Sequence, residues 1–171
     1  MSAQIQIKVT VPEIVLNSAT VRDAIMRKMQ KKTAPDLQRM FRGTVNGWQD
    51  KPDFLQQFRN SPSEVSTTVR PGLNSSGGKT YVIVNNGAEP HRITPRRGGL
   101  LRFQPGYRAG TRPRVLNSRS YSRFGSFISA QAVNHPGFEA REFDQEIADQ
   151  YADTFVDDMN DAIKVATARL A

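Results

Sequence analysis

The sequence predicts an α+β fold, in which a small antiparallel sheet is flanked by an N-terminal helix and a long C-terminal amphipathic helix. Apolar and polar side chains alternate over residues 4–11 and 64–70, which is the period of a half-buried strand. Apolar side chains recur every three to four residues in two long stretches, one towards each end of the chain, which is the period of a helix. With 171 residues, we expect a single domain over residues 1–171.

The N-terminal part is expected to contain a strand followed by helix. The alternating pattern places the strand at residues 4–11. An apolar residue at every fourth position predicts a helix over about residues 19–32. Residues 33–36 then combine a cap-type threonine with a proline in a first turn, and the apolar face continues to about Trp48. We therefore expect one kinked helix or two helices in series.

Short strands are expected in the middle of the chain. The candidates are residues 54–59, 64–70, 80–85, 100–103 and 126–133. Residues 80–85, TYVIVN, have the most β-prone composition of the chain. The segment PGLNSSGGK, which precedes them, is rich in glycine and serine and is expected to form a flexible hairpin tip.

The C-terminal third predicts one long amphipathic helix. Its apolar residues follow a single face, and carboxylates occupy most of the other positions. The apolar face comprises Phe143, Ile147, Tyr151, Phe155, Met159, Ile163, Ala166 and Leu170.

Charge is strongly segregated along the chain. Residues 90–138 contain nine arginines and no acidic residue, whereas residues 139–161 contain nine carboxylates and the single Arg141. Residues 104–125, rich in arginine, glycine and proline, have almost nothing to bury, and we expect them to form a long loop or extended arm within the domain. This arm is expected to order against a partner.

The partner of such an arm is either a polyanion or another copy of the chain. A formal net charge of +8 is compatible with nucleic acid. Arginine forks bind phosphate or carboxylate bidentately, so both partners are chemically suitable. The acidic helix favours the second copy, because the arm of one subunit can reach the helix of the next in a heterologous contact. An independent basic nucleic-acid-binding protein and a solvated loop without a partner stay open as alternatives.

The charge pattern nominates residues for a subunit or channel interface. On the basic side these are Arg96, Arg97, Arg102, Arg108, Arg112 and Arg114, and on the acidic side Asp149, Asp153, Asp157 and Asp158.

The sequence nominates no catalytic, cofactor-binding or metal-binding residue. His91 and His135 lack a third ligand at suitable spacing, and we expect them to be structural or interface residues. The chain has no cysteine, which excludes disulfides and thiolate chemistry. It also has no apolar run near the ~20 residues of a membrane span and no signal-peptide pattern, so we expect a soluble protein without a membrane partner.

Two stretches carry a resemblance to a known family. In the first, NNGAEPHRITPR is followed by GGLLRF, and in the second VNHPGFEAREF opens the long helix. With these motifs the chain resembles the neck or tail-completion (head–tail joining) proteins of long-tailed bacteriophages. It departs from a typical member in its longer loop at 104–125, its high arginine content, and residues 48–52 in place of the usual Thr-Gly turn.

The resemblance implies a non-enzymatic structural virion protein. It implies an α+β subunit that forms an oligomeric ring at the head–tail junction or the top of the tail, with about six copies expected first and about twelve as the alternative. Other neck and tail proteins would bind the ring, and genomic DNA would pass through its channel. Such a protein is made in the host cytoplasm and is located in the virion. No cofactor is implied.

Overall fold

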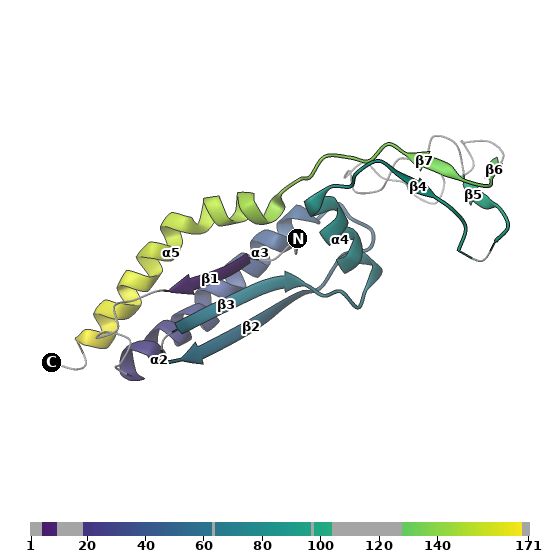
Figure 1. Cartoon of the computed structure of the whole chain (residues 1–171). Helices are drawn as coiled ribbons and strands as arrows, with labels where there is room; N and C mark the ends of the chain where they lie inside the picture. Colours follow the sequence, from purple (N-terminus) through teal and green to yellow (C-terminus); the bar gives the residue numbers. More distant parts are fainter. Residues whose placement is uncertain (1–4, 10–18, 63, 97, 104–127, 169–171) are drawn as a thin grey trace.

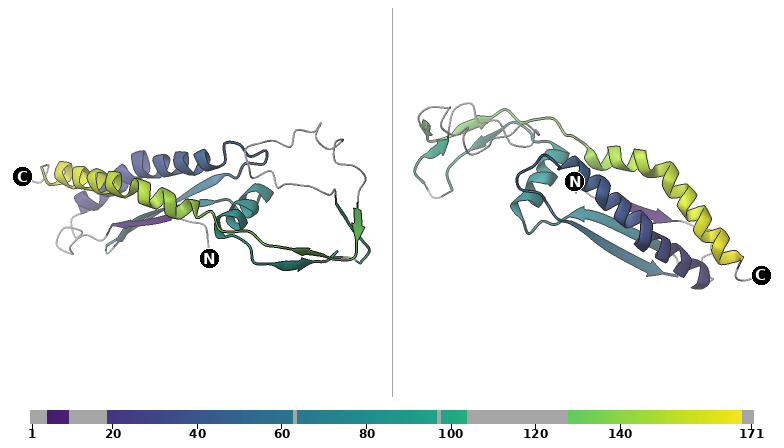
Figure 2. Two further views of the ribbon diagram at one scale, coloured as in Figure 1. Left: turned by 90° about the horizontal axis from the view of Figure 1, so that it is seen from above. Right: turned by 180° about the vertical axis from the view of Figure 1, so that it is seen from behind.

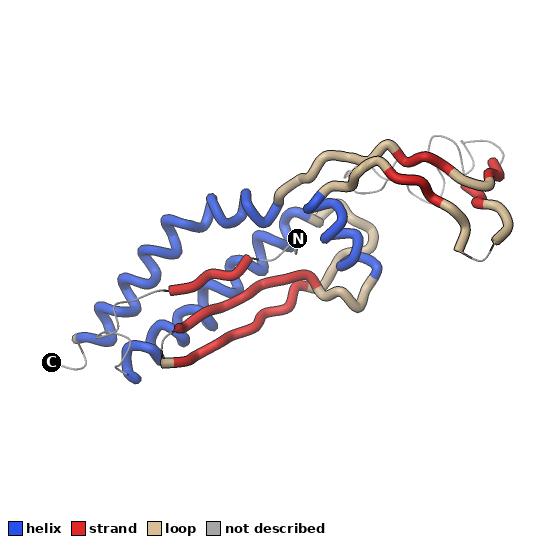
Figure 3. Tube along the Cα trace, viewed as in Figure 1, coloured by secondary structure: helices blue, strands red, loops and turns tan. Residues whose placement is uncertain are grey.

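The computed structural model describes residues 5–9, 19–62, 64–96, 98–103 and 128–168, and they form an α+β fold, as the sequence predicts (Figure 1). A body of helices packed on a small sheet occupies one end of the molecule. An extended arm of short strands projects from the other end (Figure 3). Residues 104–125, for which the sequence predicts an arginine-rich loop, lie outside the described residues.

The sheet of the body contains three antiparallel strands, β1 (Ile5–Val9), β2 (Phe54–Ser61) and β3 (Glu64–Pro71), in the order β1-β3-β2. The strands predicted at 4–11, 54–59 and 64–70 are thus confirmed. Val65, Thr67 and Val69 alternate along β3 and are fully buried beneath the helices. The opposite face of β2 is exposed, so helices cover one face of the sheet (Figure 2).

The N-terminal helical region is continuous but changes its winding near the middle. It consists of α2 (Ala19–Lys28), a π-helical turn η1 (Met29–Thr33) and α3 (Ala34–Thr44). The Ala34 amide donates to the carbonyl of Met29, five residues back. A proline inside an α-helix clashes with the carbonyl four residues before it, and the wider π turn precedes Pro35 in the first turn of α3. Of the two predicted alternatives, the structure therefore has one irregular helical region rather than two separate helices, and its irregular turn is Met29–Thr33.

The prediction of a strand at residues 80–85 is wrong, because these residues belong to helix α4 (Ser76–Asn86). The predicted hairpin tip before them is instead the loop that starts this helix. Ser75 is the N-cap, and its hydroxyl accepts a hydrogen bond from the Gly78 amide at 3.1 Å. The helix buries Tyr81 completely, so capping and tertiary packing together override the β propensity of the segment.

Tyr81 is the centre of the first of two hydrophobic clusters. Its ring contacts four other aromatic rings at centroid distances of 5.2–6.0 Å. These rings belong to Phe41 of α3, Trp48, Phe54 of β2, and Phe143 at the start of α5. Helix α4 is thereby fixed between the sheet and both long helices.

The second cluster lies between α2 and the C-terminal half of α5 (Phe143–Thr167), which confirms the predicted amphipathic helix. Its buried residues are Val21, Ile25, Met26, Met29, Val65, Met159, Ala162 and Ala166. The two clusters meet at Phe58 and Phe155, which pack against both.

The arm contains two short antiparallel pairs. Strand β4 (His91–Ile93) pairs with β7 (Val133–His135), and β5 (Leu101–Phe103) pairs with β6 (Ile128–Ala130). The predicted strand at 100–103 is confirmed as β5, and the one predicted at 126–133 is divided between β6 and β7. Strand β4 has no counterpart among the predicted strands.

Candidate functional site

The arm leaves the body through one closely packed antiparallel crossing, which we call the root. The amide of Ala88 donates to the carbonyl of Phe138 and the amide of Phe138 donates back, both at 2.9 Å. The same register continues outwards, since His91 is opposite His135. The arm is therefore a ribbon that begins at the end of α4 and returns to the start of α5.

Two glycines allow the chains to approach at the root. Gly87 has a φ of +73° and Gly137 has a φ of +77°, a backbone conformation that residues with a side chain rarely adopt. A Cβ at Gly87 would lie 2.7 Å from the Ala140 nitrogen, and a Cβ at Gly137 would overlap the carbonyl oxygen of Ala88. Both positions require glycine, because of backbone conformation and because of space.

Helices α4 and α5 are also tied directly beside the root. The side-chain amide of Asn85 donates to the Asp144 carboxylate at 2.9 Å, and its oxygen accepts from the Asp144 amide at 3.2 Å. The Asn85 carbonyl accepts from the amides of Arg141 and Glu142. Asn85 is 3% exposed, so this connection is part of the interior. It fixes the direction in which the arm leaves the body.

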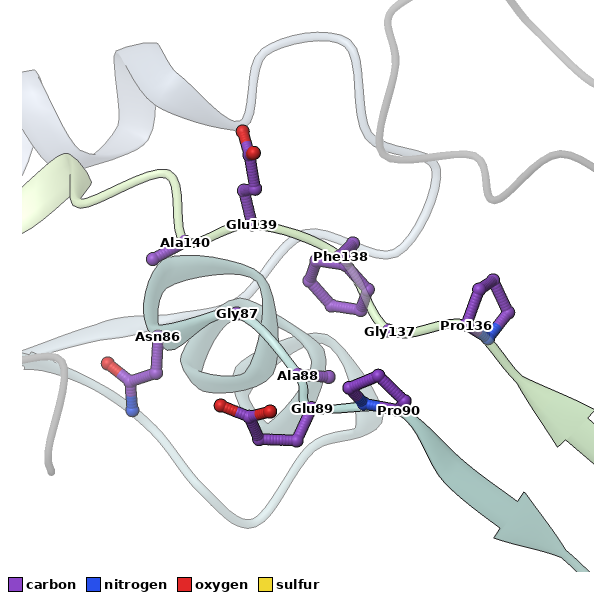
Figure 4. Close-up of a pocket in the computed structure, with 10 residues that line it drawn as sticks. All are labelled: Asn86, Gly87, Ala88, Glu89, Pro90, Pro136, Gly137, Phe138, Glu139 and Ala140. Atoms are coloured by element: carbon purple, nitrogen blue, oxygen red, sulfur yellow. The ribbon is translucent and has the colours of Figure 1, made fainter.

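A cleft of about 450 Å³ lies at the root, lined by residues 86–90 and 136–140 (Figure 4). Its apolar lining comes from Pro90, Pro136 and Phe138, and the carboxylates of Glu89 and Glu139 point in different directions. These side chains do not converge on a reacting centre, so the cleft is best described as the junction between arm and body.

The two histidines lie face to face across β4 and β7. Their ring centroids are 5.0 Å apart and the ring planes differ by 23°. The Nδ1 atom of His135 accepts a hydrogen bond from the Gly137 amide at 3.0 Å, and Nδ1 of His91 lies 2.8 Å from the Glu89 carbonyl oxygen. A metal ion must lie in the plane of each imidazole that binds it, and nearly parallel rings do not provide that geometry. This stacking fits the predicted structural role.

The structure places only part of the predicted arginine set. Arg96 is exposed on the arm after β4, and Arg102 belongs to β5. Arg97, Arg108, Arg112 and Arg114 lie outside the described residues. Both described positions belong to the arm, and the strands of the arm point away from α5 (Figures 1 and 2).

Most of the predicted acidic residues line one side of α5. Asp149, Asp153 and Asp157 are exposed and spaced by four residues, so they share a helix face. Glu146 and Asp161 extend this face at either end, and we call the five residues the carboxylate row. Gln145 and Gln150 each donate a hydrogen bond to a residue of the row, to Asp149 at 2.8 Å and to Glu146 at 3.2 Å.

Asp158, in contrast, is not part of this exposed face, which corrects its assignment to the complementary surface. It is 3% exposed and forms ion pairs with Lys32 at 2.6 Å and Lys28 at 3.3 Å, while the Tyr151 hydroxyl donates to it at 3.3 Å. Burial alone would raise the pKa of Asp158, but the hydrogen bonds from Lys32 and Lys28 outweigh burial and lower it. This cluster attaches α5 to α2 within one chain.

The sequence contains a signal for this internal cluster, which the assignment of Asp158 to the complementary surface did not use. Lys28 and Lys32 continue the spacing of Val21 and Ile25 on the apolar face of the first helix. Asp158 lies two turns after Tyr151 on the apolar face of the last helix. Opposite charges on two apolar faces that must pack together predict a buried ion pair.

Three further observations concern metal ligands, membrane-spanning helices and similarity to known proteins. In the described part of the chain, no three His, Cys, Asp or Glu side chains gather as metal ligands would. Within the same residues, none of the helices has the length and apolarity needed to cross a membrane. Comparisons with models of protein families, with curated proteins and with solved structures find no match to this chain. The site is therefore characterised by its geometry: a projecting arm and a separate carboxylate row.

Proposed function

We propose that this chain is a structural virion protein that assembles into an oligomeric ring at the head–tail junction or the top of a phage tail. Its function is recognition between copies and of neighbouring neck and tail proteins, without catalysis. About six copies form the ring, or about twelve if it lies nearer the head, and genomic DNA passes through its channel. The motifs EPHRITPR and VNHPGFEAREF support this assignment through their resemblance to neck and tail-completion proteins.

The observation that carries the proposal is the spatial separation of the two charged regions. The acid-free segment 90–138 includes β4 and β7, a strand pair that leads away from the body (Figure 1), whereas the carboxylate row belongs to α5. A subunit with a cationic arm at one end and an anionic face elsewhere is complementary to a second copy of itself. Such a contact joins different surfaces of two identical subunits, so it closes into a ring when the rotation between them permits.

The charges would determine which surfaces meet more than how tightly they bind. Each exposed arginine–carboxylate pair contributes about 0–1 kcal/mol. Long-range complementarity favours the correct register and raises the association rate. The main free energy of assembly must therefore come from apolar burial between subunits.

The experiment compares the solution mass of the wild-type chain with that of charge-reversed variants. Arg112→Glu with Arg114→Glu should abolish the ring, because two charges are reversed, the net charge changes by four units, and attraction to the carboxylate row becomes repulsion. Adding Asp153→Lys and Asp157→Lys to the same chain should restore the ring, since the glutamates at 112 and 114 of one copy then face lysines on α5 of the next copy. Lys51→Glu with Lys79→Glu makes the same charge change at exposed positions of the body and serves as the matched control.

The outcomes separate the proposal from its main alternative. Normal assembly of the arginine variant would contradict the assignment of these residues. A wild-type chain that stays monomeric, alone and with tail tubes, would contradict the ring itself. Tight DNA binding by that monomer, weakening steeply with salt, would instead support an independent nucleic-acid-binding protein.

A further inference from the structure

A shallow groove lies between the end of α3 and the start of α5. Its volume is about 350 Å³, at the lower end of the roughly 300–1,000 Å³ of ligand pockets. Met40, Phe143 and Ile147 form its apolar lining, and Glu146 and Gln150 provide polar groups. All of its lining residues belong to α3 or α5, so among the described residues the arm of the same chain does not fill it.

Gly43 keeps this groove open. It lies in the last turns of α3, where glycine costs about 1 kcal/mol relative to alanine. A Cβ at this position would meet nothing within 4 Å, so no close contact requires glycine there. The lack of a side chain instead leaves open space on this side of the groove for a group from elsewhere.

The groove borders the anionic face of the molecule. Glu146 both lines the groove and begins the carboxylate row, which continues along α5 through Asp149. Arg39, one turn before Gly43, is already ion-paired with Asp36 at 2.9 Å. An apolar side chain flanked by cations is therefore the group that this surface complements.

The arm carries such a group. Leu100 is 56% exposed, and it follows Gly98 and Gly99, whose Cβ positions would have no described residue within 4 Å. Leu100 therefore belongs to a protruding turn. In the sequence it lies between Arg96, which is exposed, and Arg102. An exposed leucine between two arginines matches an apolar groove beside carboxylates.

We propose that Leu100 of one copy inserts into the α3–α5 groove of the next copy, with its flanking arginines against the start of the carboxylate row. This inference rests on the proposed ring and specifies where the arm binds. The contact is heterologous, because the turn at Leu100 and the groove at Gly43 are different surfaces. It supplies the apolar burial that exposed charge pairs do not provide.

Cysteine cross-linking tests the contact directly, because the chain contains no cysteine. The full-length variants Gly43→Cys and Leu100→Cys are purified separately, mixed and oxidised. The mixture should form a disulfide-linked dimer that neither variant forms alone. Leu73→Cys, at an exposed apolar residue outside the arm, is mixed with Gly43→Cys as the matched control and should give no such dimer.

A second pair of variants tests whether the contact matters for assembly. Gly43→Trp should fill the groove and abolish the oligomer, whereas Gly43→Ala should assemble and unfold at a slightly higher temperature. Leu100→Ser should weaken association by about tenfold to a hundredfold. Circular dichroism of each variant shows whether the subunit itself is folded.

The results distinguish this inference from the proposed function. If the wild-type chain forms rings but Gly43→Cys and Leu100→Cys do not cross-link, and Gly43→Trp still assembles, the groove is not the binding site and the ring proposal stands. If the wild-type chain is monomeric, both are contradicted. Specific cross-linking together with loss of assembly in Gly43→Trp establishes the contact.

Discussion

Replacing Asp158 by asparagine tests the attachment of α5 to α2. The substitution preserves the shape of the side chain and its ability to accept the hydrogen bond from Tyr151. It removes the negative charge that faces Lys28 and Lys32. The two ammonium groups then lie beside a buried neutral amide, and the subunit loses stability.

The magnitude follows from the burial of the three charged groups. Removing one partner of a fully buried ion pair costs roughly 3–5 kcal/mol. Here the lysine side chains are 28% and 46% exposed, so water can solvate them after the change. We therefore expect Asp158→Asn to lower the free energy of unfolding by about 2 kcal/mol. For a chain of this size, the melting temperature should fall by about 4–8 °C.

Thermal and urea unfolding followed by circular dichroism measure this loss. Asp23→Asn, at an exposed position of α2, is the control and should change stability by no more than about 0.5 kcal/mol. If Asp158→Asn were as stable as the control, the cluster would not contribute and the reasoning would be refuted.

Acid titration provides a second measure of the same cluster. The folded pKa of Asp158 is lowered below its ordinary value of 3.8. The contribution of its ionised form is therefore complete above that value and is lost as the pH falls through the folded pKa. The stability difference between wild type and Asp158→Asn should accordingly shrink in strong acid and stay constant near neutrality.

Two further predictions concern the arm and the interior. Gly137→Ala should weaken the root by about 1–3 kcal/mol and accelerate amide hydrogen exchange at Ala88 and Phe138. Gly98→Ala is the control, because Gly98 also has a positive φ but its Cβ position has no close neighbour among the described residues. This variant should leave that exchange unchanged. Burial raises the pKa of Tyr151 to about 12, so its contribution to stability should be complete below pH 10 and be lost as the pH rises through about 12. Burial raises the pKa of Tyr81 still further, so phenolate absorbance should show two late-titrating groups in wild type and one in Tyr151→Phe. An unchanged amplitude of late titration in Tyr151→Phe would contradict the assignment.

Local periodicity accounts for what could be predicted from the sequence. The strand at 64–70 and the C-terminal helix each have one buried face, and that face is visible in the sequence as a repeat of two or of three to four residues. The same alternation of apolar and polar residues predicted the strand at 4–11. An irregularity of the first helical region near Pro35 could be predicted from the covalent geometry of proline, and the structure has a π turn just before that residue. The carboxylate row could likewise be predicted, because exposed positions on a helix follow from those that are buried.

Features that depend on contacts between distant residues could not be predicted in this way. TYVIVN favours a strand by composition, but Tyr81 packs among aromatic rings from four other segments, and that packing selects a helix. The need for glycine at 137 arises from the carbonyl of Ala88, far away in the sequence. The burial of Asp158, in contrast, could have been predicted, because its spacing from Tyr151 places it on the apolar face of α5, whereas Asp157 lies on the exposed side.

The root has a consequence for how this chain can change in evolution. Ala88 and Phe138 are hydrogen-bonded to each other, so the chain between them leaves the body and returns to it at the same place, the root. Among the described residues of this interval, none belongs to either hydrophobic cluster. The interval can therefore lengthen, shorten or exchange its composition while the body keeps its interior. A related protein that binds different neighbours could therefore differ in this interval alone and keep the same body.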